Sequence, residues 1–251
     1  MTPGLDPTAS RGLSPPALAV DLHMHTTTSD GHAPLADMIA QAERLDLSGM
    51  GVSDHVRSDT GWVPEYVRAV RSARRLAALP VRCGVEAKIL DTRGRLDLPH
   101  ALAGVDYVLV ADHRVPALDG PLHPADVRSA IDRGELPAAA VVDALIEATV
   151  RALESSPLPA IIAHLFSVLP KCGLTETAVG KEHLNRLAAT CRRTASAVEI
   201  NEKWRCPSSR VVRMLARQGV LLTAGSDAHA PAEVARWSYV RAVVDDLAAA
   251  A

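Results

Sequence analysis

The sequence predicts an α/β fold in which seven strand–helix units close into a barrel. Short apolar runs alternate with longer segments of helical period, which is the pattern of βα units. Histidine and carboxylate residues follow the apolar runs again and again along the chain. The length of 251 residues suits one α/β barrel, which commonly takes this size as a single domain.

The predicted strands are short, rich in aliphatic residues and bounded by polar or glycine-containing turns. They cover residues 17–21, 47–53, 81–86, 105–111, 160–164, 196–200 and 220–226. Residues 1–16 are rich in Pro, Gly, Ser and Thr without an apolar period, so we expect a loose tail there. Residues 17–251 are expected to form the single domain.

The helix over residues 34–45 has the clearest pattern, with a proline at its start and an apolar stripe that includes Leu35, Met38 and Ala42. Residues 114–137 interrupt the alternation with several Pro and Gly residues, and we expect them to form a partly helical lid. Further helices are predicted over residues 64–79, 140–155, 181–194, 208–218 and 231–251.

The composition is that of a globular protein without a large charge imbalance. Hydrophobic residues make up 48% and charged residues 22%, and the net charge is -2, so long nucleic acid is not an expected partner. No apolar run approaches the ~20 residues of a membrane span. The four cysteines form no C-x-x-C pair and are expected to be reduced thiols. We expect a cytoplasmic protein, and the sequence does not indicate its oligomeric state.

Histidine is unusually frequent, with 10 residues against one Phe, three Trp and three Tyr. It is the commonest metal ligand in proteins. The carboxyl ends of parallel strands converge at one edge, and a barrel brings all seven ends around one mouth, whereas an open sheet separates the outer ones. The polar residues at these ends therefore favour a barrel. They are His23, His25, Asp54, His55, Glu86, His113, His164, Glu199, Asn201, Asp227 and His229.

One stretch and six shorter motifs carry a family resemblance. The i, i+2 spacing of His23 and His25 on a strand points both imidazoles to one face, where they can hold one ion. The motifs are DLHMHTTTSDG (21–31), VSDH (52–55), GVEAKI (84–89), ADH (111–113), IIAH (161–164), VEIN (198–201) and GSDAH (225–229). In this order the chain resembles the PHP family, the phosphoesterase superfamily named from polymerase-associated and histidinol phosphatase domains.

The resemblance implies a distorted (β/α)7 TIM-like barrel with three divalent metal ions, Mn, Zn or Fe, at its carboxyl-terminal mouth. Carried over by position, it implies one ion on His23, His25, Glu86 and Asp227, a second on Glu86, His113 and His164, and a third on Asp30, His55 and His229. Some family members have a histidine where this chain has Gly31. Asp30 matches the alternative form, and His32 is left without a role.

Such a site would carry about +3 charge, because three divalent ions face three carboxylates, and it would attract an anion. Metal-bound water provides a nucleophile near neutral pH. We therefore expect a metal-dependent hydrolase of phosphate esters, with a small anionic phosphomonoester similar to histidinol phosphate or a nucleotide as substrate. The alternatives are a phosphodiesterase or exonuclease on short oligonucleotides or cyclic phosphates, a noncatalytic metal-stabilised module, and hydrolysis of a nonphosphate bond.

Basic residues beside the motifs are candidates for binding the phosphate. Arginine binds it through two hydrogen bonds and lysine as a point charge. Asp54 and Glu199 are expected to orient ligand imidazoles, and Trp204 is expected to line the pocket or to act as a packing anchor. The predicted catalytic residues are Arg114, Lys203, Arg205, Asp227 and His229.

Overall fold

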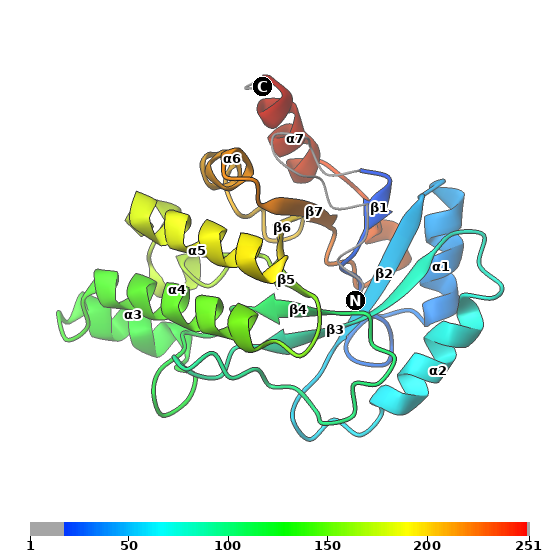
Figure 1. Ribbon diagram of the computed structural model, residues 1–251, viewed down its shortest axis with the longest axis horizontal. Coiled ribbons are helices and arrows are strands. Elements are labelled where there is room, and N and C mark those ends of the chain that lie inside the picture. Colours follow the sequence, from blue (N-terminus) through cyan, green and yellow to red (C-terminus); the bar gives the residue numbers. More distant parts are fainter. Residues whose placement is uncertain (1–17, 250–251) are drawn as a thin grey trace.

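The computed structural model describes residues 18–249, so the predicted tail lies outside the described residues. Seven parallel strands follow one another in sequence order, and helices surround them (Figure 1). This arrangement confirms the predicted (β/α)7 barrel. The strands are β1 (Val20–Asp21), β2 (Gly49–His55), β3 (Val81–Lys88), β4 (Tyr107–Ala111), β5 (Ala160–Ala163), β6 (Ala197–Asn201) and β7 (Leu221–Gly225).

The barrel closes between β1 and β7 through a few bonds just beyond the short first strand. The amide of His25 donates to the carbonyl of Ala228 at 2.8 Å, and that of Leu22 to Ala224 at 3.3 Å. The buried carboxylate of Asp21 accepts hydrogen bonds from the amides of Ser226 and Ala235, both at 3.0 Å. Burial raises the pKa of Asp21 to about 6, although these hydrogen bonds oppose the rise.

Side chains fill the inside of the barrel in the alternating pattern of strands. On β4, Tyr107, Leu109 and Ala111 face inward, whereas the residues between them pack under the helices. Tyr107 crosses the barrel, and its hydroxyl donates to the carbonyl of Leu22 at 2.6 Å. The ring fits because Gly51 and Gly84 on the neighbouring strands have no side chain; a Cβ at either position would overlap the Tyr107 hydroxyl group.

The helices cover the strands on the outside of the barrel (Figure 1). Within residues 114–137, α3 provides the expected helical part, and its Val127 is buried. The cysteines have free, buried thiols, as predicted. The helices are α1 (Leu35–Arg44), α2 (Val63–Ala73), α3 (Pro124–Asp132), α4 (Ala138–Ser155), α5 (Lys181–Thr194), α6 (Ser209–Arg217) and α7 (Tyr239–Ala249), with 3-10 turns at Pro170–Cys172, Glu176–Ala178 and Pro231–Glu233.

Two predicted helix boundaries are wrong. The helix expected from residue 231 begins only at Tyr239, because Ala235 has a left-handed backbone with φ of 48°. The Glu202 carboxylate then caps α7 by accepting hydrogen bonds from the amides of residues 238–240. The helix expected to reach residue 79 ends at Ala73, and the Arg74 side chain instead binds the Asp106 carboxylate and the Val81 carbonyl.

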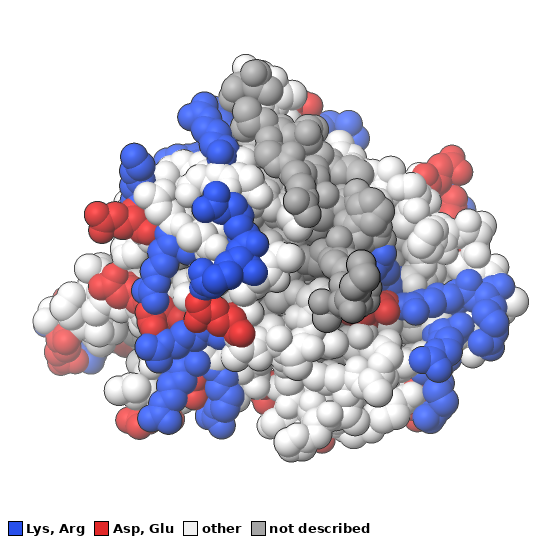
Figure 2. Space-filling model, viewed as in Figure 1, with Lys and Arg blue, Asp and Glu red and all other residues white. Residues whose placement is uncertain are grey.

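Charged side chains are distributed unevenly over the surface. Figure 2 shows acidic and basic groups intermixed over α4 and α5, where Arg186 pairs with Glu147 and Arg193 with Glu154. Basic groups gather over α2. Among residues 18–249, no helix has the length and apolar character needed to cross a membrane.

Candidate metal centre

Glu86 lies at the centre of a cluster of imidazoles at the carboxyl-terminal mouth of the barrel. It is on β3 with its side chain directed into the barrel and only 1% exposed. Its Oε1 lies 3.0 Å from Nε2 of both His113 and His164, and its Oε2 lies 3.1 Å from Nδ1 of His55. Imidazoles from the carboxyl ends of β2, β4 and β5 therefore meet at one carboxylate on β3.

His23 and His25 approach Glu86 from the segment after β1. The Nε2 atoms of both rings are 3.4 Å from Glu86 Oε2 and 3.1 Å from each other. Asp227, after β7, places Oδ1 3.5 Å from Nε2 of His25. These four side chains offer convergent donor atoms on one side of the cluster.

Asp30 completes a second group nearer the solvent. Its carboxylate is 54% exposed, and its Oδ2 lies 3.4 Å from His55 Nε2 and 3.5 Å from His229 Nε2. Its other oxygen lies 3.7 Å from Nδ1 of His25. Three sets of donor atoms are compact enough to hold an ion: His25 with Asp30, His55 and His229; His23 with His25 and Glu86; and His55 with Glu86 and His113.

Two buried atoms of the cluster indicate that a cation fits it. His25 Nδ1 and Glu86 Oε2 have no hydrogen-bond partner among the described residues. Buried polar atoms in proteins are normally satisfied. Imidazole nitrogens and carboxylate oxygens are ligands of Zn, Mn and Fe. An ion in the Asp30 group would satisfy His25 Nδ1, and an ion held by His23, His25 and Glu86 would satisfy Glu86 Oε2.

The acidic and imidazole groups shift one another's pKa strongly. Burial opposes the ionisation of Glu86, but attraction by His23 and His113 holds its pKa well below 4.5. Burial alone would lower the pKa of His164, but Asp112 and Glu86 raise it to about 10. For His55, burial and neighbouring imidazoles lower the pKa to about 4. In the absence of a metal, protons on some imidazoles therefore balance the buried carboxylates.

Two further carboxylates, those of Glu199 and Asp112, contact the ring nitrogens of His23 and His164 that do not face Glu86. Glu199 on β6 accepts a hydrogen bond from His23 Nδ1 at 2.7 Å and another from the amide of His164 at 2.7 Å. This leaves His23 Nε2 facing Glu86. Asp112 lies 3.3 Å from Nδ1 of His164 and also accepts a hydrogen bond from Ser167.

The backbone is strained at two residues of the cluster. His164 has φ of 31° and Asp227 has φ of 56°, both in the left-handed region that non-glycine residues rarely adopt. Such conformations concentrate at functional sites, where the surrounding structure holds them. His164 comes directly after β5 and Asp227 two residues after the end of β7, and both side chains reach the cluster.

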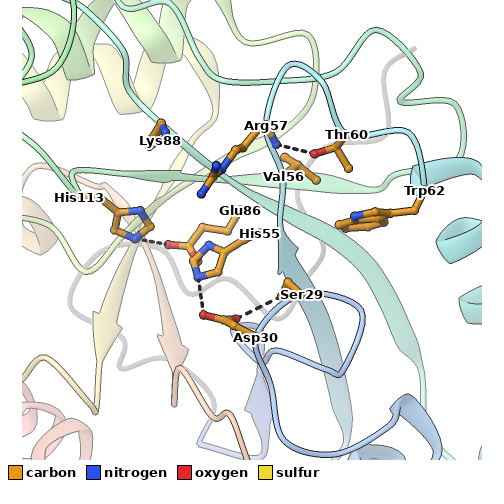
Figure 3. A pocket seen from close by; sticks show the side chains of 10 residues that line it. All are labelled: Ser29, Asp30, His55, Val56, Arg57, Thr60, Trp62, Glu86, Lys88 and His113. Atoms are coloured by element: carbon orange, nitrogen blue, oxygen red, sulfur yellow. Dashed lines mark hydrogen bonds and ion pairs between the residues drawn. The ribbon is translucent and has the colours of Figure 1, made fainter.

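A cavity of about 540 Å³ opens beside the cluster (Figure 3). The cluster forms one side of it through Asp30, His55, Glu86 and His113. Figure 3 shows the opposite side formed by the loop after β2 and by the end of β3. The residues lining that side are Val56, Arg57, Thr60, Trp62 and Lys88.

Comparison with known proteins decides the family. The family model described as PHP domain matches residues 21–203. The chain belongs to the PHP domain family. A probable phosphatase of Caldicellulosiruptor saccharolyticus is 28% identical over 244 residues, which cover 91% of this chain and 87% of that protein. One from Caldicellulosiruptor bescii is 25% identical, covering 90% and 86%.

The fold of this PHP domain is also found in a solved structure. Histidinol phosphate phosphatase from Lactococcus lactis, crystallised with zinc, L-histidinol and phosphate, superposes with a TM-score of 0.67. The match covers 91% of this chain and 93% of that protein at 14% sequence identity. At that identity the similarity supports the barrel fold.

The structure of the PHP domain brings together all nine residues predicted as metal ligands. Their role as ligands stays a prediction. The three compact sets differ from those implied by the resemblance. Asp227 and His164 belong to none of them, although Asp227 lies 3.5 Å from His25 and His164 lies 3.0 Å from Glu86. In addition, His25 joins the Asp30 group, and His55 joins Glu86 and His113. The nine residues are His23, His25, Asp30, His55, Glu86, His113, His164, Asp227 and His229.

The three basic residues predicted to bind phosphate differ in whether they contact the cluster. Lys203 reaches the cluster, with Nζ 3.3 Å from Asp227 Oδ1 and 2.9 Å from His229 Nδ1. The exposed Arg205 lies over the ring of Tyr239, 5.7 Å from its centroid. Arg114 is exposed beside His113. Of these three cations, Lys203 is the one in contact with the cluster.

Trp204 borders the cluster but is not among the residues that line the cavity beside it. Its indole N–H donates to Asp227 Oδ2 at 2.9 Å, and its ring lies 6.1 Å from that of His164. The prediction that Asp54 orients an imidazole is wrong. Asp54 instead accepts hydrogen bonds from the amides and hydroxyls of Thr26 and Ser29, and so shapes the loop that carries Asp30.

Asp112 and Ser167 are partners of His164 that were not predicted from the sequence. Asp112 stands in the ADH motif directly before His113, so its carboxylate was visible in the sequence. Ser167 is three residues after His164, and only the left-handed turn at His164 brings its hydroxyl to 3.0 Å from Nδ1 of that ring. The remaining histidines, His32, His100, His123 and His183, are not part of the cluster.

Proposed function

We propose that this PHP domain is a metal-dependent phosphatase that hydrolyses small phosphomonoesters at a site holding three divalent ions. The observation that carries the proposal is the buried Glu86 carboxylate in reach of five imidazoles, with two further carboxylates beside it. The names of the curated relatives and the phosphate in the Lactococcus lactis structure support phosphate ester chemistry.

Divalent ions held by this cluster would supply Lewis acidity and lower the pKa of bound water to about 7. The chain's own groups prepare the site for them. When the His23 ring is neutral, Glu199 keeps its remaining proton on Nδ1, so Nε2 offers its lone pair to the centre. Asp112 and Ser167 fix the ring of His164 in the same way. Lys203 adds a positive charge beside Asp227, where an anionic substrate would bind.

The proposal is tested by hydrolysis assays on the purified protein supplied with Mn, Zn or Fe. We expect turnover of phosphomonoesters, and loss of at least about a thousandfold for Asp227→Asn or His164→Ala, because each removes a donor from the metal cluster. The exposed variant Glu154→Gln provides the control and should keep wild-type rates. Failure to hydrolyse any phosphate ester, or retained activity in both cluster variants, would contradict the proposal.

The same assay separates monoesters from diesters. Bis(4-nitrophenyl) phosphate and dinucleotides are tested beside 4-nitrophenyl phosphate and mononucleotides. We expect the larger kcat/KM for the monoesters. Faster hydrolysis of the diesters would favour the phosphodiesterase alternative, and bound metal without turnover would favour a noncatalytic module.

A further inference from the structure

The cavity beside the cluster is larger than a phosphoryl group needs. Ligand pockets of several hundred Å³ enclose most of a small organic molecule, and this one measures about 540 Å³. If the phosphoryl group lies against the cluster, as the proposed function requires, the leaving group must occupy the rest. The residues on the opposite side of the cavity then determine which leaving groups bind.

Arg57 is the cation on that side without a partner. Among residues 18–249, its guanidinium group makes no hydrogen bond or ion pair. Lys88, in the same wall, forms an ion pair with Asp97, in which Lys88 Nζ lies 3.2 Å from the Asp97 carboxylate. Figure 3 shows the Arg57 side chain extending over the cavity toward Glu86 and His113. The charge of Arg57 is therefore available to a bound molecule.

The backbone around Arg57 is held in place before any ligand arrives. The amide of Val56 donates to the Glu86 carbonyl at 2.9 Å, which ties the loop to β3. The amide of Arg57 donates to the Thr60 hydroxyl at 2.8 Å, and the amide of Ser58 to Asp97 at 2.8 Å. A fixed loop lowers the entropic cost of using the side chain for recognition.

Trp62 provides an apolar wall in the same cavity. Its ring is half-buried and packs edge-on against Tyr66, with centroids 5.4 Å apart. An aromatic face of this kind suits the flat, apolar part of a ligand. The wall thus combines a surface for a ring or carbon skeleton with a positive charge.

We propose that Arg57 selects phosphomonoesters whose leaving group carries a second anionic group, a carboxylate or a phosphate, and that Trp62 contacts the body of that leaving group. The proposal rests on the proposed function for the position of the phosphoryl group. It disfavours substrates with a cationic leaving group, because Arg57 would repel an ammonium group in this cavity.

Binding of phosphonate probes tests the selection without turnover. Benzylphosphonate, 4-carboxybenzylphosphonate and 4-(aminomethyl)benzylphosphonate are titrated calorimetrically into the metal-loaded protein. We expect the carboxylated probe to bind about tenfold or more tightly than the other two, the range for a hydrogen-bonded charge pair. In Arg57→Gln this preference should disappear, in Arg57→Lys part of it should remain, and the exposed control Arg68→Gln should keep it.

Each other outcome overturns the proposal. Equal affinity for the three probes, no binding of any probe, or a preference that persists in Arg57→Gln would show that Arg57 does not select the leaving group. An equal loss for all three probes in Arg57→Gln would place Arg57 on the phosphoryl group instead. Hydrolysis of phenyl phosphate is measured separately, so failure of the proposed function is distinguished from failure of this selection.

Discussion

At the scale of single residues, the cluster depends on groups that do not belong to it. Glu199 passes close to β7 because Gly225 has no side chain; a Cβ there would overlap Glu199 Oε1. From this position Glu199 holds both the ring of His23 and the backbone of His164. A metal ligand held in this way is more basic and better oriented than a free imidazole.

Replacement of this carboxylate should weaken metal binding. We expect Glu199→Gln to lower the affinity for Zn or Mn about tenfold to a hundredfold, because the amide no longer polarises the His23 ring. Competition with a chromophoric chelator measures the affinity. The control Glu154→Gln, on the outside of α4, should bind metal like the wild type. Unchanged affinity in Glu199→Gln would contradict a positioning role for Glu199.

Gly225→Ala provides a second test of the same contact. The added methyl group must displace Glu199 or shift β7, so metal affinity should fall although no charged group is removed. A variant that folds, as judged by circular dichroism, and still binds metal at wild-type strength would show that the Glu199 position is not needed.

At the scale of elements, local patterns predicted the strands better than the helix ends. The apolar runs correspond to all seven strands because both faces of the sheet are buried. On β4, Tyr107, Leu109 and Ala111 face the inside of the barrel, and the valines between them pack under the helices. The start of α7 was missed because the group that caps it, Glu202, is distant in sequence from the amides it binds. Contacts of this kind have no local signal.

The stability of the barrel should depend on the buried hydroxyl group of Tyr107. We expect Tyr107→Phe to lower the free energy of unfolding by about 1–3 kcal/mol, because the buried hydrogen bond to the Leu22 carbonyl is lost between β4 and the segment after β1. Urea unfolding, followed by circular dichroism, measures this change in the free energy of unfolding. Leu76→Ala, at a side chain that is 90% exposed, should change stability by less than about 0.5 kcal/mol. An equally small effect of Tyr107→Phe would contradict this role.

At the scale of the whole molecule, the cluster joins segments from residue 23 to residue 229. Eight of its nine members were predicted to meet because they stand at or just after the end of an apolar run, and parallel strand ends converge in a barrel. Asp30 was placed among them only by the family resemblance. The wall formed by Arg57, Trp62 and Lys88 was not predicted. Arg57 and Trp62 lie between β2 and α2, outside any periodic segment, and no local pattern shows that Lys88, at the end of β3, lines the same cavity. The metal centre was therefore easier to predict than the leaving-group pocket.

Because so many segments contribute donors, metal binding should stabilise the whole barrel. A ligand present at a hundred times its Kd adds about 2.7 kcal/mol to the stability of the native state. For a protein of this size we expect removal of metal by a chelator to lower Tm by roughly 5–10 °C. Differential scanning calorimetry of the loaded and stripped protein measures this shift, and equal Tm values would contradict a shared metal centre.

The Tm difference between the metal-loaded and the metal-free protein should increase with pH. In the metal-free protein the pKa of His164 is raised to about 10 and that of His23 well above 6.5, so both rings carry protons at neutral pH. Their raised pKa stabilises the stripped fold fully below pH 6.5, and this contribution is lost as the pH rises toward 10. Metal binding requires neutral rings and must displace those protons.

The Tm difference between loaded and stripped protein should therefore widen from pH 6 to pH 8, and titrations in buffers of different ionisation enthalpy should show proton release. A difference that narrows over this range, or metal binding without proton release, would show that these imidazoles are not metal ligands.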